Sequence, residues 1–385
     1  MKTFAAALLA LIAWGDGPVR KAIHVPCETS GPACGEALQA AIDRAPAGLT
    51  LTLEPGKVYE GTIVIRPKRG ADAETRLTLT TRGWIDTGRG WDGLVTPADK
   101  PRLAVLRGAP RSNAAIDIRN GPAGGHVDLV GLAFDATPPA GQGEVIRIGS
   151  GKETSAANLA RHVSIRQVLI QGSREFGQKR GIAGNGQDIA ISQVWCEEIF
   201  IAGQDTQCIS AWNGGKRVRV DHSYLAAGAE NILVGGAPTA SAEMHPEDWT
   251  IEDNILHKPL RWKEDGRNRQ VKNLFEVKFV HGLVARRNLL VNNWSSAQDG
   301  KAILLHYTTN GPCPHCGGLR DVVLEDNVIL NSPGGISFQG YSYQASHRSG
   351  EKLLRATVRN NYFVLTGAGS HRAIAIGNVL GRHDI

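Results

Sequence analysis

Aromatic residues are scarce in this sequence: Phe, Trp and Tyr together make up 6% of its 385 residues. We therefore expect a core of stacked aliphatic side chains. No stretch after residue 15 is long enough to cross a membrane. No phosphate-binding loop or nucleotide fingerprint occurs either, and Gly184-Asn185-Gly186 is interpreted as a turn. These absences argue against membrane insertion and against nucleotide-dependent chemistry.

What the chain does contain indicates a globular, strand-rich protein. It is 42% hydrophobic and 21% charged, and its 46 glycines favour a turn-rich β architecture. The length suits two or three domains, or one elongated repeat domain. The net charge of +6 is compatible with ordinary solubility or with an acidic partner, either a polyanionic polysaccharide or a nucleic acid. Because no nucleic-acid motif accompanies the charge, we expect an acidic polysaccharide.

Residues 1–15 have the pattern of a secretory signal. Lys2 provides a positive start, Thr3 to Trp14 is nearly all apolar, and the small residues Ala13 and Gly15 precede a cut before Asp16. We expect a mature protein that is secreted or periplasmic.

The six cysteines fall in three close pairs, which agrees with export: Cys27 with Cys34, Cys196 with Cys208, and Cys313 with Cys316. An even number suggests disulfides, although sequence alone does not fix their connectivity. Cys313-Pro-His-Cys316 could instead form half of a zinc site, but no second half follows.

The segment 16–65 is predicted to be an N-terminal cap. Residues 35–45 (GEALQAAIDRA) form a short amphipathic helix, and two alternating strands with a Pro-Gly turn follow. Residues 66–114 show weak periodicity and are interpreted as early coils with long loops.

From residue 126 a strand motif recurs at intervals of roughly 25 to 40 residues, the range of stacked supersecondary units. No helix separates the repeats, which excludes tetratricopeptide, ankyrin and leucine-rich designs. Asparagine occupies the third position of four consecutive units and predicts a ladder of side-chain amides. The aligned third positions are Leu132, Val168, Val194, Ser223, Asn254, Asn288, Asn327 and Asn361.

Each repeat has a second strand with one inward aliphatic or aromatic residue. Stacking these residues predicts the core of a parallel β-helix, with neighbouring coils about 4.8 Å apart. The inward column is Ile182, Ile209, Ile232, Phe275, Ile303, Ile336 and Ile374. One outward column is Ala183, Ser210, Leu233, Glu276, Leu304, Ser337 and Ala375, and the next is Asn185, Trp212, Gly235, Lys278, His306, Gln339 and Gly377.

This pattern resembles the right-handed parallel β-helix (pectate-lyase-like) superfamily. The expected fold is all-β: a single-stranded right-handed solenoid over residues 66–385, closed by the short N-terminal capping helix. The chain ends at Ile385 where another strand would begin, so we expect a truncated C-terminus or a lost coil. The superfold hosts lyases, hydrolases, esterases, epimerases and adhesins, so it does not define the activity.

The most informative outward patch is formed by Glu276, Lys278 and His306. Period-two alternation in Asn273–Phe279 puts Glu276 and Lys278 on one face, and Lys301–Tyr307 puts His306 on the next rung. β-Elimination of a uronate needs a group that neutralises the carboxylate, a base for the C5 proton and an acid for the leaving oxygen. A lysine among other cations has a lowered pKa and can serve as the base.

The Glu-x-Lys pair followed by a strand ending in His resembles polysaccharide lyase family six. The resemblance implies Lys278 as base and a calcium ion held by Glu276 with Asn231 or Glu230. In that family an Arg beside the His is the acid, whereas this chain has Leu304-Leu305-His306. The acid would then be His306 or an arginine elsewhere.

Other residues are predicted to bind the sugar chain. Trp212 would stack on a ring, while Asn185, Gln339 and His306 would bond hydroxyls. The carboxylates of the substrate would meet Lys278 and a basic loop made of Lys258, Arg261, Lys263, Arg267, Arg269 and Lys272. The loop could equally be a solvated charged turn, because Glu264 and Asp265 interrupt it.

Three alternatives remain open at this point. A glycoside hydrolase on the same fold needs two or three close carboxylates, and the outward columns show only Glu276. A pectate-lyase-type calcium site needs an Asp cluster, which is missing. A non-catalytic carbohydrate-binding or surface adhesion module would need no Glu276–Lys278–His306 cluster, and Glu276–Lys278 would then be a surface ion pair. We expect a monomer in each case.

Overall fold

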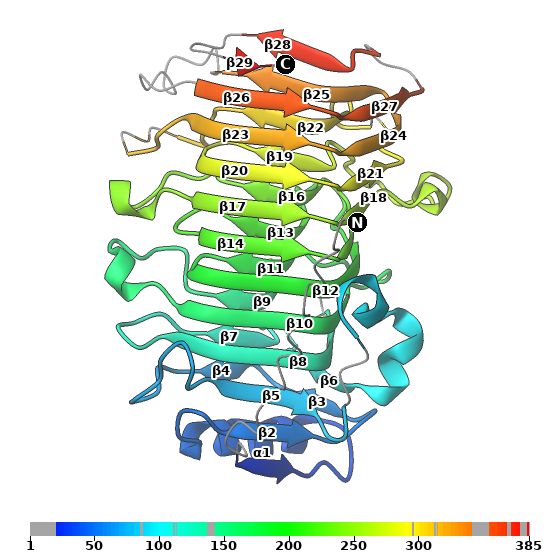
Figure 1. Cartoon of the computed structure of the whole chain (residues 1–385). Coiled ribbons are helices and arrows are strands. Elements are labelled where there is room, and N and C mark those ends of the chain that lie inside the picture. Colours follow the sequence, from blue (N-terminus) through cyan, green and yellow to red (C-terminus); the bar gives the residue numbers. More distant parts are fainter. Residues whose placement is uncertain are drawn as a thin grey trace, which may run out of the picture.

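The structure is a computed structural model that describes residues 21–84, 88–110, 112, 114–136, 143–294, 296–311, 313, 315–340, 354–367, 371–377 and 383–384. The strands form a right-handed parallel β-helix, whose coils stack from the N-terminal helix to the last strands (Figure 1). The predicted signal segment, residues 1–15, lies outside the described residues, and export stays a prediction. None of the described helices has the length and apolar character needed to span a bilayer.

One wall of the solenoid is a ten-stranded sheet in which strands pair in parallel with the preceding and following coil. We call it the site sheet. Its strands are β4 (Ile63–Ile65), β7 (Ile116–Ile118), β9 (Glu144–Ile148), β11 (Arg180–Gly184), β13 (Gln207–Ala211), β16 (Glu230–Val234), β19 (Phe275–Val277), β22 (Lys301–His306), β25 (Gly334–Gln339) and β28 (Ile374–Gly377).

The remaining strands form a sheet of nineteen strands that wraps the other side of the coils. They are β1 (Ala22–Val25), β2 (Thr50–Leu53), β3 (Val58–Glu60), β5 (Leu77–Thr81), β6 (Ala104–Arg107), β8 (Gly125–Asp135), β10 (Arg161–Gln171), β12 (Gln187–Ile199), β14 (Lys216–Asp221), β15 (Tyr224–Ala227), β17 (Glu247–Glu252), β18 (Ile255–His257), β20 (Val280–Arg286), β21 (Leu289–Val291), β23 (Leu319–Glu325), β24 (Val328–Ser332), β26 (Leu354–Arg359), β27 (Tyr362–Leu365) and β29 (His383–Asp384).

The predicted inward column forms the core of the site sheet. Ile182 pairs with Ile209, Ile209 with Ile232, and the register continues without a slip through Phe275 to Ile374. The column is fully or nearly fully buried as far as Ile336. Each fully buried aliphatic side chain contributes about 1.5–3 kcal/mol, so the stack is a main source of stability.

The predicted asparagine ladder is confirmed. The side-chain oxygen of Asn288 accepts the backbone N–H of Asn254 at 3.1 Å and its side-chain amide at 3.0 Å. Asn327 accepts from Asn288, and Asn361 from Asn327, in the same way. The ladder satisfies backbone groups that the turn leaves without a strand partner, and so fixes the height of each coil.

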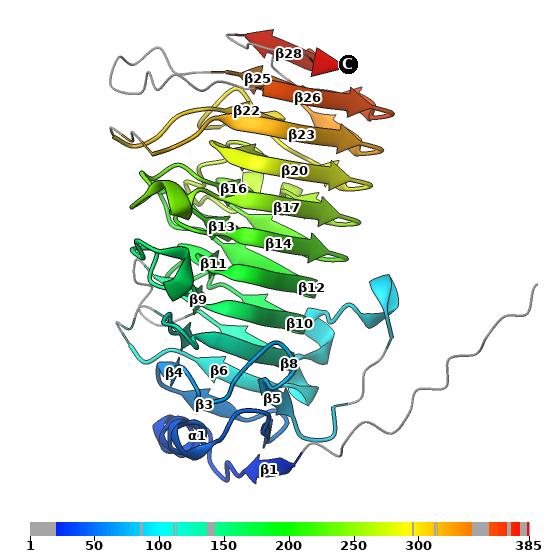
Figure 2. The ribbon, with the colours of Figure 1, turned by 60° about the vertical axis from the view of Figure 1, so that its left-hand side comes forward.

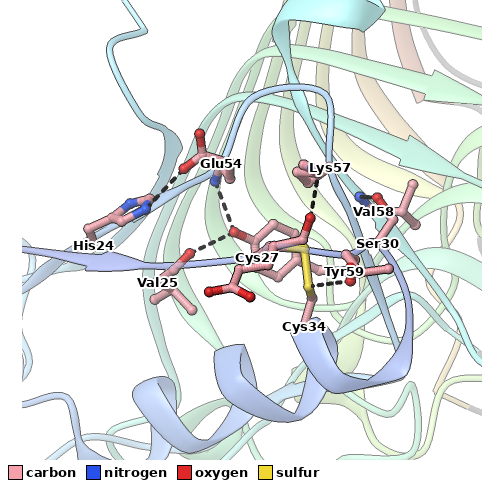
Figure 3. The surroundings of a disulfide bond; sticks show 11 residues. His24, Val25, Cys27, Ser30, Cys34, Glu54, Lys57, Val58 and Tyr59 are labelled. Carbon is pink, nitrogen blue, oxygen red and sulfur yellow. Dashed lines mark hydrogen bonds and ion pairs between the residues drawn. A yellow bond between two sulfur atoms is a disulfide. The ribbon is translucent and has the colours of Figure 1, made fainter.

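The N-terminal end is capped as predicted, by helix α1 (Pro32–Arg44), which buries Leu38 and Ile42 against the first coil. A disulfide between Cys27 and Cys34 ties the segment before the helix to its first turn (Figure 3). Beside it, the Tyr59 hydroxyl donates to the carbonyl of Val25 at 2.7 Å. Cap and first coils are thereby joined by covalent and polar contacts.

A segment between β5 and β6 covers part of the outer face of the larger sheet and projects beside the stack in Figure 2. It contains the 3-10 helices η1 (Gly90–Gly93) and η2 (Pro97–Arg102), and the buried Gln193 amide holds it by donating to the carbonyls of Gly88 and Gly90. Three further 3-10 helices lie in connections: η3 (Ala156–Asn158), η4 (Ala242–Met244) and η5 (Leu260–Lys263).

All three close cysteine pairs are disulfides, including Cys313–Cys316. The half-zinc interpretation of Cys313-Pro-His-Cys316 is therefore wrong, because both thiols are used in the bridge. Tyr307, which directly follows β22 and its last residue His306, donates from its hydroxyl to the carbonyl of Cys316 at 2.8 Å. The bridged loop is thus tied to the site sheet.

Candidate active site

The outward face of the site sheet is hollowed by two adjoining cavities of about 730 and 270 Å³, which share Glu276, Lys278 and Gln298. We call the two together the groove. Because neighbouring coils stack vertically, it is lined by residues distant in sequence. Its charged lining residues are Lys179, Arg180, Asp205, Glu230, Lys272, Glu276, Lys278, Asp299 and Lys301.

The structure brings Glu276 and Lys278 together on the outward face, as the alternation predicts. Their side chains form an ion pair, in which Glu276 is almost fully buried and Lys278 remains partly exposed. The Asn273 amide donates to the other carboxylate oxygen at 3.0 Å. Burial acts to raise the pKa of Glu276, but Lys278 and the hydrogen bonds outweigh it and hold that pKa below its ordinary value. Glu276 is therefore ionised.

Glu230 stands beside Glu276 from the preceding coil and is fully buried. Gln207 donates to it at 2.8 Å. Burial and the neighbouring Glu276 charge raise the pKa of Glu230 to about 8. At neutral pH it is consequently a protonated acid that hydrogen-bonds to Glu276. The outward face thus carries two adjacent carboxyl groups, and the expectation of a single one was wrong.

His306 lies in the groove one coil beyond Lys278, opposite Gln339 in the strand register. Burial and the positive charge of Lys278 lower the pKa of His306 to about 4. The imidazole is therefore neutral at neutral pH. Its chain neighbours are Leu305, which points into the core, and Tyr307, so no arginine flanks the histidine.

Five cationic and four acidic side chains line the groove, and one of the acids, Glu230, is protonated at neutral pH. Lys272 forms an ion pair with Asp205 at 2.6 Å. Burial lowers its pKa, but Asp205, Glu230 and Glu276 together raise it above the ordinary value. Lys179 makes no ion pair with any described residue. A surface of this kind suits a polyanion better than a neutral sugar.

Two asparagines predicted to bind ligand are fully buried and do not line the groove. Asn185 is fully buried, and its side-chain oxygen accepts the backbone N–H groups of Trp212 and Asn213 at 3.0 and 3.1 Å. Asn231 is also fully buried and does not line the groove; its oxygen accepts the N–H of Ala227 and the ammonium of Lys258. Because Asn231 is fully buried and does not line either cavity, it is removed from the predicted metal set.

Most of the basic loop, including Arg261, is directed away from the groove. Arg261 binds Glu198 at 2.8 Å, and the buried Arg269 binds Glu198 and Asp265. Lys258 is completely buried, and its ammonium donates to three consecutive carbonyls at 2.6–3.0 Å: those of Ala227, Gly228 and Ala229. Burial lowers the pKa of Lys258 to about 7. Of the six loop cations, Lys272 is the one that lines the groove.

The family resemblance implies a calcium ion beside Glu276, and several oxygens lie there. Glu230 and Glu276 supply carboxyl oxygens, and the Asn273 side-chain oxygen is buried without a hydrogen-bond partner. Calcium prefers carboxylate and amide oxygens, so these three residues fit it. The described residues contain no group of three or more His, Cys, Asp or Glu side chains that could hold a metal. Asn273, unlike Asn231, lies beside Glu276 in the groove.

One column of residues that lines the groove was not predicted as a column from the sequence. Arg180 pairs with Gln207, and Gln207 with Glu230, two residues before the inward isoleucine of each strand. By the same register Asn273 and then Lys301 follow. The repeat alignment already contained this column. Alternation alone would point these side chains inward with the isoleucine, which is why Arg180 was not selected and why Glu230 was named only through the family resemblance.

Comparisons with known proteins bear on the fold. The chain matches no protein-family model, and no curated protein is similar to it in sequence. Among solved structures, an alginate lyase from Paenibacillus sp. str. FPU-7 is similar in fold: the TM-score is 0.53 and the identity 13%, covering 91% of this chain and 99% of that one. At this identity the likeness establishes the β-helix fold.

Two further structures share lower similarity. One is a mannuronic acid specific polysaccharide family 6 lyase from human gut microbiota, with a TM-score of 0.48, 13% identity, and coverage of 93% of this chain and 83% of that one. The other is a Yersinia enterocolitica family 28 exopolygalacturonase, with a TM-score of 0.48, 12% identity, and coverage of 89% and 65%.

Proposed function

We propose that the protein is a lyase that cleaves a uronate-containing polysaccharide by β-elimination. The observation behind this proposal is the position of Lys278 in the groove, ion-paired with Glu276 and one coil from His306. An amine, a carboxylate and an imidazole lie within two rungs, so one bound sugar ring can contact all three. The excess of cations in the groove favours an acidic chain. Alginate is the first substrate to test, because an alginate lyase shares the fold.

In β-elimination a base removes the C5 proton of a uronate, the electrons form the C4–C5 double bond, and the bond from C4 to the glycosidic oxygen breaks. The leaving oxygen then needs a proton. We assign the base to Lys278, which must be neutral when it acts. Its partner Glu276 keeps it at the floor of the groove.

We do not assign the general acid, which protonates the leaving oxygen, to a charged residue other than Lys278. Among the described residues that line the groove, Arg180 is the one arginine, and it lies three rungs from Lys278. His306 is neutral and can donate a hydrogen bond, but it has no extra proton to release. Lys278 becomes an ammonium once it has taken the C5 proton. We therefore infer that it returns this proton to the leaving oxygen, while His306 positions the ring.

Glu230, Glu276 and Asn273 would hold a calcium ion where one is bound. Its charge would neutralise the uronate carboxylate and so make the C5 proton easier to remove. Without the ion, Glu230 and Glu276 form the hydrogen-bonded pair described above, and Asn273 donates to Glu276.

A glycoside hydrolase fits the groove less well. In a glycoside hydrolase the two catalytic carboxyl groups lie about 5 Å or more apart, with the sugar or a water between them. Glu230 and Glu276 are instead in hydrogen-bond contact. A non-catalytic binding module remains the competing function and would bind the polymer without producing a double bond.

The test is to incubate the protein with alginate, pectate and glycosaminoglycans and to follow the ultraviolet absorbance of the C4–C5 double bond. The proposal expects a rise with at least one polymer and none with Lys278→Ala. Binding without any rise across the panel would support the module instead.

A further inference from the structure

The far end of the groove contains a second cationic position, remote from Lys278. Arg180 lies on β11, three strands from Lys278 on β19, which corresponds to about 14 Å along the stack given the spacing of neighbouring strands. This exceeds the reach of either side chain, so Arg180 cannot take part in the proton transfers at Lys278.

Arg180 is held rigidly from three sides. It donates to Glu144 and to Gln207, each at 3.2 Å, and its guanidinium lies 4.9 Å from the centre of the Trp212 ring. Glu144 is shared with Arg147, which donates to it at 2.9 and 3.1 Å. Glu144 is therefore not dedicated to Arg180, and the guanidinium, which has five N–H groups, retains donors for a ligand.

Two further groups make this end of the groove a site rather than a surface ion pair. The Ser210 hydroxyl lines the cavity, is 2% exposed and has no hydrogen-bond partner. Lys179 lies next to Arg180, lines the same cavity and is in direct ion-pair contact with none of the described acids, although the charges of Glu144 and Asp205 act on it. Leaving a buried hydroxyl unpaired is unfavourable, and a hydroxyl or carboxylate of a ligand would supply the missing partner.

We propose that Arg180, Lys179 and Ser210 form a distal subsite for the carboxylate of a second uronate residue, with Trp212 as the positioning residue for the guanidinium. The subsite rests on the proposed function, since it selects the same polymer. It implies that an oligosaccharide must reach across three rungs to bind fully, and that charge is recognised away from the reacting bond. Trp212, predicted to stack on a sugar, instead presents its ring to Arg180.

The experiment measures calorimetric dissociation constants for uronate oligosaccharides of increasing length, from disaccharide to hexasaccharide, in the Lys278→Ala background so that no substrate is consumed. The subsite predicts a step in affinity at the length that first spans the groove. Arg180→Gln should remove the step and weaken hexasaccharide binding about tenfold or more, the worth of a charge-assisted hydrogen bond. Carboxyl-reduced hexasaccharide should bind equally to both proteins.

Two controls separate positioning from loss of structure. Trp212→Ala should behave like Arg180→Gln, whereas Trp212→Phe, which keeps a ring beside the guanidinium, should restore most of the affinity. Arg76→Gln removes a similarly half-buried arginine, paired with Asp128 at 3.1 Å away from the groove, and should bind every length normally.

The inference is overturned if Arg180→Gln binds every length as tightly as its parent while the native enzyme still cleaves the polymer. If the native protein neither binds nor cleaves any uronate oligosaccharide, the proposed function itself fails. The two failures are therefore distinguishable.

Discussion

The carboxyl groups of Glu230 and Glu276 meet on adjacent rungs of the site sheet. At neutral pH Glu230 is protonated and Glu276 is ionised. Burial alone would raise the pKa of both. Lys278 lowers that of Glu276, and the resulting negative charge raises that of Glu230 to about 8 from its ordinary 4.5. The protonation state of this pair therefore responds to the charge of the groove and to any cation bound there.

Glu230→Gln should raise the melting temperature at pH 9 and change it little at pH 5. The folded pKa of Glu230 lies above its unfolded value, so its contribution to stability is complete below about pH 4.5 and is lost as pH rises through about 8. Glutamine keeps the neutral form at every pH. Calorimetry should show a difference of a few kcal/mol at pH 9.

Calcium provides the matched control for this pair. If Glu230, Glu276 and Asn273 hold the ion, calcium should raise the melting temperature of the native protein at pH 8 to 9 and leave Glu230→Gln nearly unaffected. Equal stabilisation of both proteins would place any bound calcium elsewhere.

His306→Gln should reduce kcat by only about tenfold, because glutamine still offers an N–H donor and a neutral His306 supplies no proton. A true general acid would cost about 10² to 10⁴-fold. His306 should also leave no inflection in the pH–rate profile between pH 5 and 8, given its pKa of about 4. An inflection there that disappears in His306→Gln would assign it the acid role.

Lys258→Met should destabilise the protein by several kcal/mol without altering the groove. The substitution leaves three backbone carbonyls and the Asn231 oxygen buried without their donor. Lys263→Met, in the same loop but outside the interior, is the control and should be nearly neutral. If Lys258→Met melts like the native protein, the buried ammonium is not structural.

Asn288→Ala should cost about 3 kcal/mol, because it removes the acceptor for Asn254 and the donor to the carbonyl of Ile251. Asn361→Ala, at the more exposed end of the ladder, should cost less. Urea unfolding of the two variants measures the difference. Equal and small effects would mean that the ladder follows the coil geometry without stabilising it.

The sequence was sufficient for the fold because the solenoid repeats one pattern, in which an inward apolar residue recurs on successive coils and a turn asparagine recurs on four consecutive ones. Ile209, Ile232 and Phe275 align in the structure as they do in the repeats. The same register placed Glu276, Lys278 and His306 correctly, since residues two apart on a strand share a face.

Prediction failed where side chains leave the strand pattern. Arg180 has the spacing of an inward residue, yet it lines the groove, and Glu230, which has the same spacing, was named only through the family resemblance. Asn185 and Asn231 were assigned to ligand by residue type, but each satisfies buried backbone groups at a corner of the coil. Arg261 was placed by its charge alone, and its partner Glu198, distant in sequence, becomes a neighbour only through stacking. Corner geometry and partners on other coils are not readable from one strand at a time.

The most direct test of the central claim is the ultraviolet absorbance of alginate and other uronate polymers incubated with the native protein and with Lys278→Ala. The account predicts a steady rise for the native protein, from a new C4–C5 double bond at each cleaved end, and no rise for a Lys278→Ala variant that still binds the polymer. A rise that persists in Lys278→Ala, or cleavage that yields only saturated ends, would contradict it.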